Sequence, residues 1–306
     1  MAYVTPTSFL AGEYFTRLRM LLSRDAPPAA IDFIAQRKGV FDDVLQEALL
    51  ATYRRGATPV AASVYFITPM DDSSIEVRAS GSFRLPDRAG DPWILPRTAD
   101  QERLVECLRR TPHRLADWGY TVSTGPLVWN RHKDQLRSSL TPGAYPLIWA
   151  EAVASDGRFV FRAAKKNHEP YFRPTKGQEW LMVREPCVLV QRTTAKEQTR
   201  RLIAAALPPG FLRRYGAAVI ENHLNMIRPI RPNPVPPAVL TAFLNSAVAD
   251  RAFRCITGSV AVSAYELEAL PLPSPENLRT LARLVASDSG PVEIDDACTC
   301  LYGISP

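Results

Sequence analysis

The sequence has few cysteines and no long apolar segment. Its five cysteines in 306 residues are an odd number without regular spacing, which is not the pattern of a disulfide framework and indicates a reducing compartment. Cys298 and Cys300 are close together, but a Cys-x-Cys without a second pair or a nearby histidine is not the pattern of a metal site. No stretch reaches the roughly 20 apolar residues of a membrane span. We therefore expect a cytoplasmic protein with no structural metal and no membrane partner.

Common catalytic motifs are missing as well. The sequence contains no Gly-x-Ser-x-Gly, His-Glu-x-x-His, Gly-x-x-x-x-Gly-Lys or Cys-x-x-Cys. The histidines, His113, His132, His168 and His223, stand far apart, and we expect none of them to have a partner carboxylate. Only His132 and His168 have neighbours that suggest a binding role. These absences argue against the common hydrolase, nucleotide-binding and thiol-exchange chemistries.

The composition is that of a globular protein with a basic second part. At 306 residues and 46% hydrophobic, the chain can form one large core or two ordinary ones. Because domains have about 150 residues on average, this length favours two domains. Lysine and arginine number 37 against 31 aspartate and glutamate, and most of the excess follows residue 100. Clustered cations release counterions when they meet phosphates, so this asymmetry suggests a polyanionic partner, although a solvated basic surface fits equally well.

The first part of the chain alternates β-prone and helical stretches. Ala2 to Thr5 is β-prone, Ser8 to Leu22 has helical spacing, and β-prone runs follow at 30–35, 44–53 and 61–67. This pattern predicts an α/β sheet. The glycine-rich turn that normally holds a cofactor at a helix N-terminus does not occur in it. We therefore expect only the rear part of a Rossmann-like cofactor-binding sheet, with the rest supplied by another segment.

The second part is predicted to be mixed α+β and rich in β-structure. Helical spacing at 99–110 leads into β-prone runs between Tyr120 and Arg192. Prolines at 229–237 indicate a stiff connector, and a helix is expected at 238–253. The expected divisions are 1–90 for the partial α/β domain, 91–117 for a connecting helix, 118–275 for a β-rich domain, and 276–306 for a tail with one helix.

Four segments in a fixed order carry a resemblance to a known family. They are AYVTPTSFL at 2–10, VFDDVLQ at 40–46, VSTGPLVWNR at 122–131, and LNS at 244–246 together with LPLP at 270–273. Together they resemble the back half of adenine-specific DNA methyltransferases of restriction-modification systems, those with a TaqI-like C-terminal specificity domain. The resemblance covers nearly the whole chain, and it implies that residues 118–275 form a target-recognition domain for double-stranded DNA.

The resemblance implies a role for Phe41. Such enzymes flip an adenine out of the duplex and methylate its exocyclic amine with S-adenosylmethionine. In the segment that VFDDVLQ resembles, an aromatic residue stacks on the flipped base, and the match falls on Phe41. The alternative is a core phenylalanine at the head of a strand. The position of Phe41 between Gly39 and the acidic pair Asp42 and Asp43 favours an exposed loop and hence the stacking role.

The catalytic signature of the family does not occur. That signature is Asn, Asp or Ser, followed by Pro-Pro and an aromatic residue. The Pro-Pro pairs at 27–28, 208–209 and 236–237 lack both the polar residue before and the aromatic residue after. The cofactor loop and the ribose-binding acid are also missing. We expect the chain alone to be inactive and not to bind S-adenosylmethionine, and we expect a separate chain or an upstream segment to carry those motifs.

Three polar clusters are candidates for reading DNA. Asn and Gln can pair with adenine and Arg with guanine in the major groove, while Lys mainly meets phosphate. Each cluster follows an apolar β-prone run, whereas a single such cluster is also typical of a solvated loop. The candidate DNA-binding residues are Asn130, Arg131, His132 and Lys133; Arg162, Lys165, Lys166 and Asn167; and Gln191, Arg192 and Lys196.

The sequence thus favours the C-terminal portion of a site-specific adenine methyltransferase, which supplies base stacking and target recognition. A cognate restriction endonuclease is a further possible partner. Two alternatives stay open. The chain is a DNA-binding specificity module without catalysis, or it is a truncated remnant that does not fold alone, because the exposed face of half a sheet is a poor domain boundary.

Overall fold

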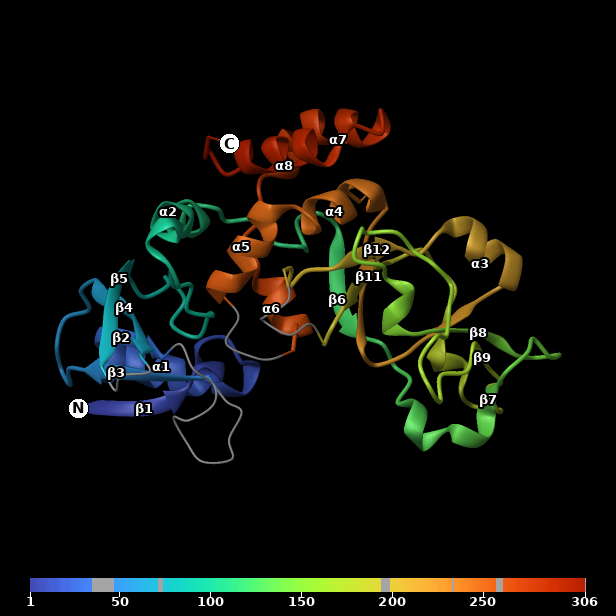
Figure 1. Cartoon of the computed structure of the whole chain (residues 1–306), viewed down its shortest axis with the longest axis horizontal. Helices are drawn as coiled ribbons and strands as arrows, with labels where there is room; N and C mark the ends of the chain where they lie inside the picture. Colours follow the sequence, from blue (N-terminus) through green and yellow to red (C-terminus); the bar gives the residue numbers. More distant parts are fainter. Residues whose placement is uncertain (35–46, 71–73, 194–198, 233, 257–260, 306) are drawn as a thin grey trace.

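The computed structural model describes all residues except 35–46, 71–73, 194–198, 233, 257–260 and 306. Two β-containing parts lie on either side of a group of helices (Figure 1). The blue N-terminal sheet is on one side, and the green and yellow β-rich part is on the other. Helices α4 (Pro237–Leu244), α5 (Ala247–Ile256) and α6 (Ala264–Ala269) lie between them.

The N-terminal sheet is mixed, with strand order β1-β3-β2-β4-β5. Its strands are β1 (Ala2–Pro6), β2 (Pro28–Ile34), β3 (Ala48–Tyr53), β4 (Ala62–Pro69) and β5 (Ile75–Phe83). Strand β3 is antiparallel to both β1 and β2, so those two strands run in the same direction, and β2 is parallel to β4. Helix α1 (Thr16–Asp25) connects β1 to β2. Strand β1, helix α1 and strand β2 therefore form a strand–helix–strand unit, and the antiparallel strand β3 lies between its two strands.

Two local predictions for this part differ from the structure. The helix expected at Ser8 to Leu22 begins only at Thr16 and is preceded by short 3-10 helices at Thr7–Leu10 and Glu13–Phe15. Gly12 lies between them, and a Cβ there would be 2.8 Å from the Ser8 carbonyl oxygen. Strand β5 lies outside the β-prone runs that the sequence predicts. It is an edge strand with mostly exposed side chains, so the apolar alternation of a half-buried strand is weak in its sequence.

A buried arginine fixes the entry into α1. Arg19 is fully buried and donates hydrogen bonds to the backbone carbonyls of Phe9, Gly12 and Gly90 at 2.7 to 3.0 Å. Burial lowers the pKa of the Arg19 guanidinium, but the three carbonyls satisfy its donors. The sheet core beside it is aromatic, with Trp93 in ring contact with Phe9 and Phe83.

The β-rich part contains two sheets. One has the strand order β10-β13-β8-β9-β7, and the other β12-β11-β14-β6. Strands β8 and β13 are parallel, and the remaining pairs are antiparallel. The bounds are β6 (Tyr120–Thr124), β7 (Leu136–Arg137), β8 (Tyr145–Ile148), β9 (Tyr171–Phe172), β10 (Met182–Val183), β11 (Val188–Gln191), β12 (Ala204–Ala206), β13 (Ala218–Ile220) and β14 (Leu224–Pro229). Short 3-10 helices lie at Trp129–Arg131, Lys133–Gln135, Ala150–Ala152 and Glu179–Leu181, and helix α3 spans Pro209–Tyr215.

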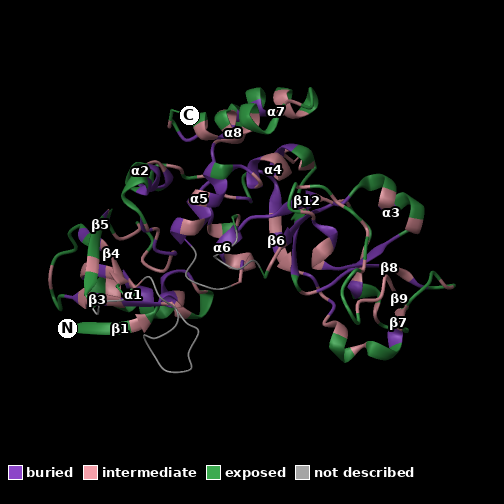
Figure 2. Cartoon of the chain, viewed as in Figure 1, coloured by how far each residue is buried: buried purple, intermediate pink, exposed green. Residues whose placement is uncertain are grey.

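The helices share one large hydrophobic core with β6, β11 and β14. It includes side chains of α2 (Glu102–Arg109), α4, α5, α7 (Arg279–Ala286) and α8 (Pro291–Cys300). Buried residues run through α4, α5 and β6 in the middle of the molecule (Figure 2). The helix expected at 99–110 is confirmed as α2, preceded by a 3-10 turn at Ala99–Gln101.

Two predictions for the C-terminal part need correction. The helix expected at 238–253 is broken at Asn245 and Ser246, because the Ser246 hydroxyl accepts a hydrogen bond from Ala249 N and begins α5. The tail contains two helices, α7 and α8, rather than one. Both pack on α4 or α5 and bury Leu281, Cys298 and Tyr302 in the large core.

The fold class is therefore mixed α and β, as expected, and two of the three sheets in the described ranges contain both parallel and antiparallel pairs. All five cysteines are free thiols. None of the helices in the described part of the chain combines the length and the apolar character needed to cross a lipid bilayer.

Candidate nucleic-acid interface

The candidate interface lies where two parallel strands end. Ile148 at the end of β8 is in register with Ile220 at the end of β13. Glu221 N donates a hydrogen bond of 3.1 Å to Ile148 O, which continues the pairing one residue further. The carboxyl ends of parallel neighbours meet at one edge of a sheet. The residues that follow the two strands, 149–151 and 221–223, are therefore brought together there.

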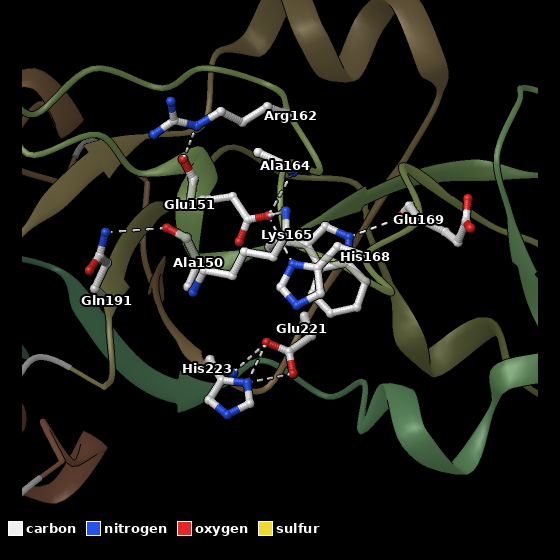
Figure 3. A network of polar contacts seen from close by, with 11 residues as sticks. Ala150, Glu151, Arg162, Ala164, Lys165, His168, Glu169, Gln191, Glu221 and His223 are labelled. Carbon is white, nitrogen blue, oxygen red and sulfur yellow. Dashed lines mark hydrogen bonds and ion pairs between the residues drawn. The ribbon is translucent and has the colours of Figure 1, made fainter.

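A glutamate–histidine pair lies beyond β8. The Glu151 carboxylate is 2.8 Å from His168 Nδ1, and it also accepts a hydrogen bond of 3.0 Å from Ala164 N (Figure 3). The His168 ring stacks on Trp149 with a centroid distance of 3.7 Å and an interplanar angle of 10°. Burial alone would raise the pKa of Glu151, but the hydrogen bonds from His168 and Ala164 hold it below its ordinary value. Glu151 thus fixes the loop that carries the second predicted cluster.

A second pair lies beyond β13. The buried Glu221 carboxylate is 2.7 Å from His223 Nδ1 and accepts a hydrogen bond of 2.8 Å from His223 N. The His223 side chain is 46% exposed. Figure 3 shows this pair together with the Glu151–His168 pair. The expectation that the histidines have no carboxylate partner is wrong for His168 and His223, and His113 also lies 3.9 Å from Asp117.

The first predicted cluster is joined to this edge by Trp129. Its ring contacts Trp149 and His168, with centroid distances of 5.9 and 6.4 Å. Asn130 and Arg131 follow on the same 3-10 turn and are exposed. His132 Nδ1 is 2.8 Å from Gln135 Oε1, and the Lys133 ammonium lies 5.7 Å from the centre of the Trp129 ring. Lys133 thus lies over a ring that packs against Trp149 and His168, and Asn130 and Arg131 project from the same turn.

The second predicted cluster is mostly exposed. Arg162 Nε donates to the Glu151 carbonyl, so its guanidinium is anchored at one end. Lys165, Lys166 and Asn167 are exposed in the loop that Glu151 holds. Asn167 has a φ of 69°, in the left-handed region that asparagine tolerates better than most residues.

The third predicted cluster is largely engaged within the protein. Gln191 Nε2 donates to Val153 O at 2.7 Å and to Ala150 O at 3.3 Å. Arg192 Nη1 donates to Asn222 O at 3.2 Å, and Arg192 N donates to His223 O at 2.9 Å. Lys196 lies outside the described residues. Gln191 and Arg192 therefore connect β11 to the same two turns, 149–153 and 221–223.

Sequence reasoning anticipated the clusters but missed what holds them together. The β-prone runs expected before the first two clusters are single bridges at Leu127 and Phe159 rather than strands. Glu221 stands only two residues before His223, so that pair could have been recognised in the sequence. Glu151 is 17 residues from His168 and becomes its partner only through the fold.

A cavity lies at the carboxyl ends of β1 and β2, and Arg201 and Arg254, from outside the N-terminal sheet, also line it. Its volume is about 280 Å³, and its lining includes Thr7 after β1 and Ile34 at the end of β2. The Arg97 guanidinium lies 3.7 Å from the centre of the Phe33 ring, and burial lowers its pKa to about 10. Phe41 lies outside the described residues. The residues that flank its segment, Ile34 and Glu47, both line the cavity.

The described residues do not fit an S-adenosylmethionine site. After β1 the chain enters a 3-10 turn at Thr7–Leu10 behind Pro6, rather than a glycine-rich loop and a helix N-terminus. The second proline of each Pro-Pro pair is the first residue of a strand or helix, namely of β2, α3 or α4. These pairs therefore have a structural role at the beginning of an element. Within the described ranges no three His, Cys, Asp or Glu side chains are grouped as metal ligands.

Comparison with known proteins identifies homologues over almost the whole chain. No protein-family model matches the sequence. The chain is 28% identical over 309 residues to the type II methyltransferase M.BsuBI of Bacillus subtilis, covering 96% of the chain and 60% of that protein. It is 29% identical to the type II methyltransferase M.PstI of Providencia stuartii, covering 92% of the chain and 57% of that protein. The chain is therefore homologous to type II methyltransferases and spans somewhat less than two thirds of their length.

A solved structure supports the fold. The type IIL restriction-modification enzyme MmeI, determined in complex with DNA, aligns with a TM-score of 0.54 and 11% identity, covering 100% of the chain and 47% of that enzyme. At this level of identity the likeness concerns the fold, and the chain shares it with part of that enzyme.

Proposed function

We propose that this chain is the target-recognition and base-stacking part of a DNA methyltransferase that transfers a methyl group from S-adenosylmethionine to the exocyclic amine of adenine. The homology to type II methyltransferases supports the reaction class. The cofactor loop and the catalytic tetrapeptide are assigned to the portion of the enzyme that this chain does not match. That portion belongs to a separate or adjoining segment.

The observation that carries the proposal is the meeting of the three polar clusters at one sheet edge. Trp149 and Glu151 hold the first two clusters, and Gln191 and Arg192 join the third to the same turns. We call this surface, formed by residues 129–133, 149–153, 162–168, 191–192 and 221–223, the recognition face. Exposed amide and guanidinium groups on a rigid base are suited to base edges, and the exposed lysines to phosphates.

The cavity at the other sheet is the proposed site for the flipped base. In open α/β sheets, ligands bind outside the carboxyl ends of the strands, and this cavity lies at the carboxyl ends of β1 and β2. Its lining combines the aromatic rings of Phe33 and Phe66 with the arginines Arg97, Arg201 and Arg254. Because the segment that contains Phe41 starts and ends at this cavity, we assign Phe41 to stack on the extruded adenine.

The free edge of β1 is the proposed attachment point for the remaining sheet. Among the described strands, β1 pairs with β3 alone, and it is exposed along most of its length (Figure 2). Tyr3 and Val4 are 53% and 51% exposed. An unpaired, partly apolar edge is a template for another strand. The missing cofactor-binding strands would extend the sheet from this edge.

One observation favours the alternative of a specificity module that binds DNA without catalysis. The described residues do not fit an S-adenosylmethionine site, since after β1 the chain enters a 3-10 turn at Thr7–Leu10 rather than a glycine-rich loop. This alternative shares the recognition face with the leading proposal but needs neither cofactor nor partner.

Methyl transfer separates the two functions. Labelled S-adenosylmethionine and mixed-sequence DNA are incubated with the purified chain, alone and together with the product of the reading frame directly upstream. The proposal predicts labelled adenine in the mixture and none with either protein alone. DNA binding without transfer in the mixture would leave only the specificity module.

A further inference from the structure

The turn between β13 and β14, Glu221 to His223, is held by its neighbours more firmly than an ordinary surface turn. Asn222 N donates to Leu127 O at 2.9 Å, and Leu127 N donates to Ile220 O at 3.1 Å. On the other side, Gly125 N donates to Leu224 O at 2.8 Å. The segment that follows β6 therefore clamps both ends of the turn.

Gly125 permits this clamp. A Cβ atom at position 125 would lie 2.3 Å from the Glu221 carbonyl oxygen and 2.9 Å from that of Ile220. No side chain fits at such distances, so the close approach of the two backbones requires glycine. The resulting contact fixes the position of Glu221.

Glu221 in turn fixes the His223 ring. Its side chain is 1% exposed, and its oxygens lie 2.7 and 2.9 Å from His223 Nδ1. Since an ionised carboxylate only accepts hydrogen bonds, Nδ1 carries the proton in this pair. When the imidazole is neutral, the other ring nitrogen, Nε2, is then a hydrogen-bond acceptor. The His223 side chain is 46% exposed and that of Glu221 only 1%, so the imidazole ring is the part of the pair that a ligand can reach.

The surroundings of His223 belong to the recognition face. Its carbonyl accepts a hydrogen bond from Arg192 N, and Glu221 N is bonded to Ile148, the residue before Trp149. His223 thus lies next to Arg192 of the third cluster and close to the turn that carries Trp149 and Glu151.

We propose that His223 is a specificity-determining residue that reads one base pair of the target, and that Glu221 is its positioning residue. The inference rests on the proposed function of the recognition face in binding duplex DNA. In the major groove, the hydrogen-bond donors on base edges are the exocyclic amines of adenine N6 and cytosine N4. An imidazole acceptor held in one orientation can accept a hydrogen bond from such an amine. A base carbonyl at the same position has no hydrogen to donate, so the imidazole nitrogen would have no partner there.

The test is selection of bound sequences from a randomised duplex library by the full chain, at one salt concentration, followed by affinity measurements on the selected duplex. His223→Ala is compared with the wild-type chain. His223→Gln serves as a second variant of similar polarity, and circular dichroism verifies that each variant is folded. His113→Ala is the matched control, because His113 also lies near a carboxylate but outside the recognition face.

The wild-type chain is expected to select one motif. Both His223 variants should lose or change the preference at one position of that motif only, with affinity for the wild-type motif lowered about 2- to 12-fold, as expected for one hydrogen bond. Glu221→Gln keeps an acceptor oxygen and should weaken the preference at the same position, which a general loss of stability would not do. His113→Ala should select the wild-type motif.

Two outcomes would overturn the inference in distinguishable ways. If the wild-type chain selects a motif and folded His223 variants select the same motif with the same affinity, His223 does not read DNA and the proposed function stands. If the wild-type chain selects no sequence, the proposed recognition function fails and the inference fails with it.

Discussion

Gly125 lies so close to the backbone of Glu221 that a Cβ atom at position 125 would be 2.3 Å from the Glu221 carbonyl oxygen. This contact joins the end of β6 to the turn after β13. It gives a physical reason for the glycine in the Val-Ser-Thr-Gly segment through which the sequence resembles DNA methyltransferases.

Replacement of Gly125 by alanine should therefore destabilise the protein. The added methyl group forces the two backbones apart, which typically costs about 1 to 3 kcal/mol. Chemical denaturation measures the change. Gly210→Ala is the matched control, because the nearest atom to its Cβ is Arg213 Nη2 at 3.7 Å and its helical position favours alanine. Equal stability of the two variants would contradict the close contact.

Glu151→Gln should remove the part of the folding stability that depends on the ionised Glu151 carboxylate. The pKa of Glu151 is lower in the folded protein than its ordinary value of 4.5, so its contribution is complete above that value and is lost as the pH falls through the folded pKa. The variant should be less stable than the wild type near neutral pH, and the difference should shrink in strong acid. Free energies of unfolding across this range measure it, with Glu276→Gln as an exposed control. A difference independent of pH would contradict the assignment.

Val4→Lys should block assembly with the complementing segment and leave the chain folded. A lysine on an edge strand opposes the addition of a further strand. Val77→Lys is the matched control, since Val77 is 52% exposed on β5 at the opposite edge of the same sheet. Co-purification with the product of the upstream frame is the measurement. Loss of assembly in both variants or in neither would contradict the role of β1.

Phe41→Ala should weaken methyl transfer by the assembled enzyme without loss of target binding. Stacking of a base on an aromatic ring is worth about 1 to 3 kcal/mol. Transfer rates and duplex affinities are compared among the wild type, Phe41→Ala and Phe41→Trp, which keeps an aromatic face. Unchanged transfer in Phe41→Ala would remove the stacking assignment.

Periodicity in the sequence predicted the elements whose buried faces are strong. Helix α2 has Leu104, Val105 and Leu108 on one buried face, and its position was predicted well. Strand β5 was missed because its exposed edge leaves little alternation. Helix α8 was missed although Gly290, Pro291 and Glu293 form a recognisable helix start.

The arrangement of the candidate site could not be predicted in the same way. Asn130 and Lys165 are recognisable as polar residues after apolar runs, but their common location depends on the parallel pairing of β8 and β13. The sequence suggests Gln191 as a base-reading amide, whereas its Nε2 donates to the backbone carbonyls of Ala150 and Val153. Such contacts join residues distant in sequence, and no local pattern encodes them.

The most direct test of the central claim is the salt dependence of duplex DNA binding by the recognition face. Fluorescence anisotropy of the full chain with the selected duplex is measured over a range of salt concentrations. The wild type is compared with Arg131→Ala, with Lys165→Ala and with Arg283→Ala, an exposed control on α7.

The account predicts tight, salt-sensitive binding by the wild type and the control. Lys165→Ala should bind all sequences more weakly and lower the salt slope by about one unit, while Arg131→Ala should lose sequence preference. Binding that is unaffected by the Arg131 and Lys165 replacements, or weakened equally by Arg283→Ala, would contradict the account.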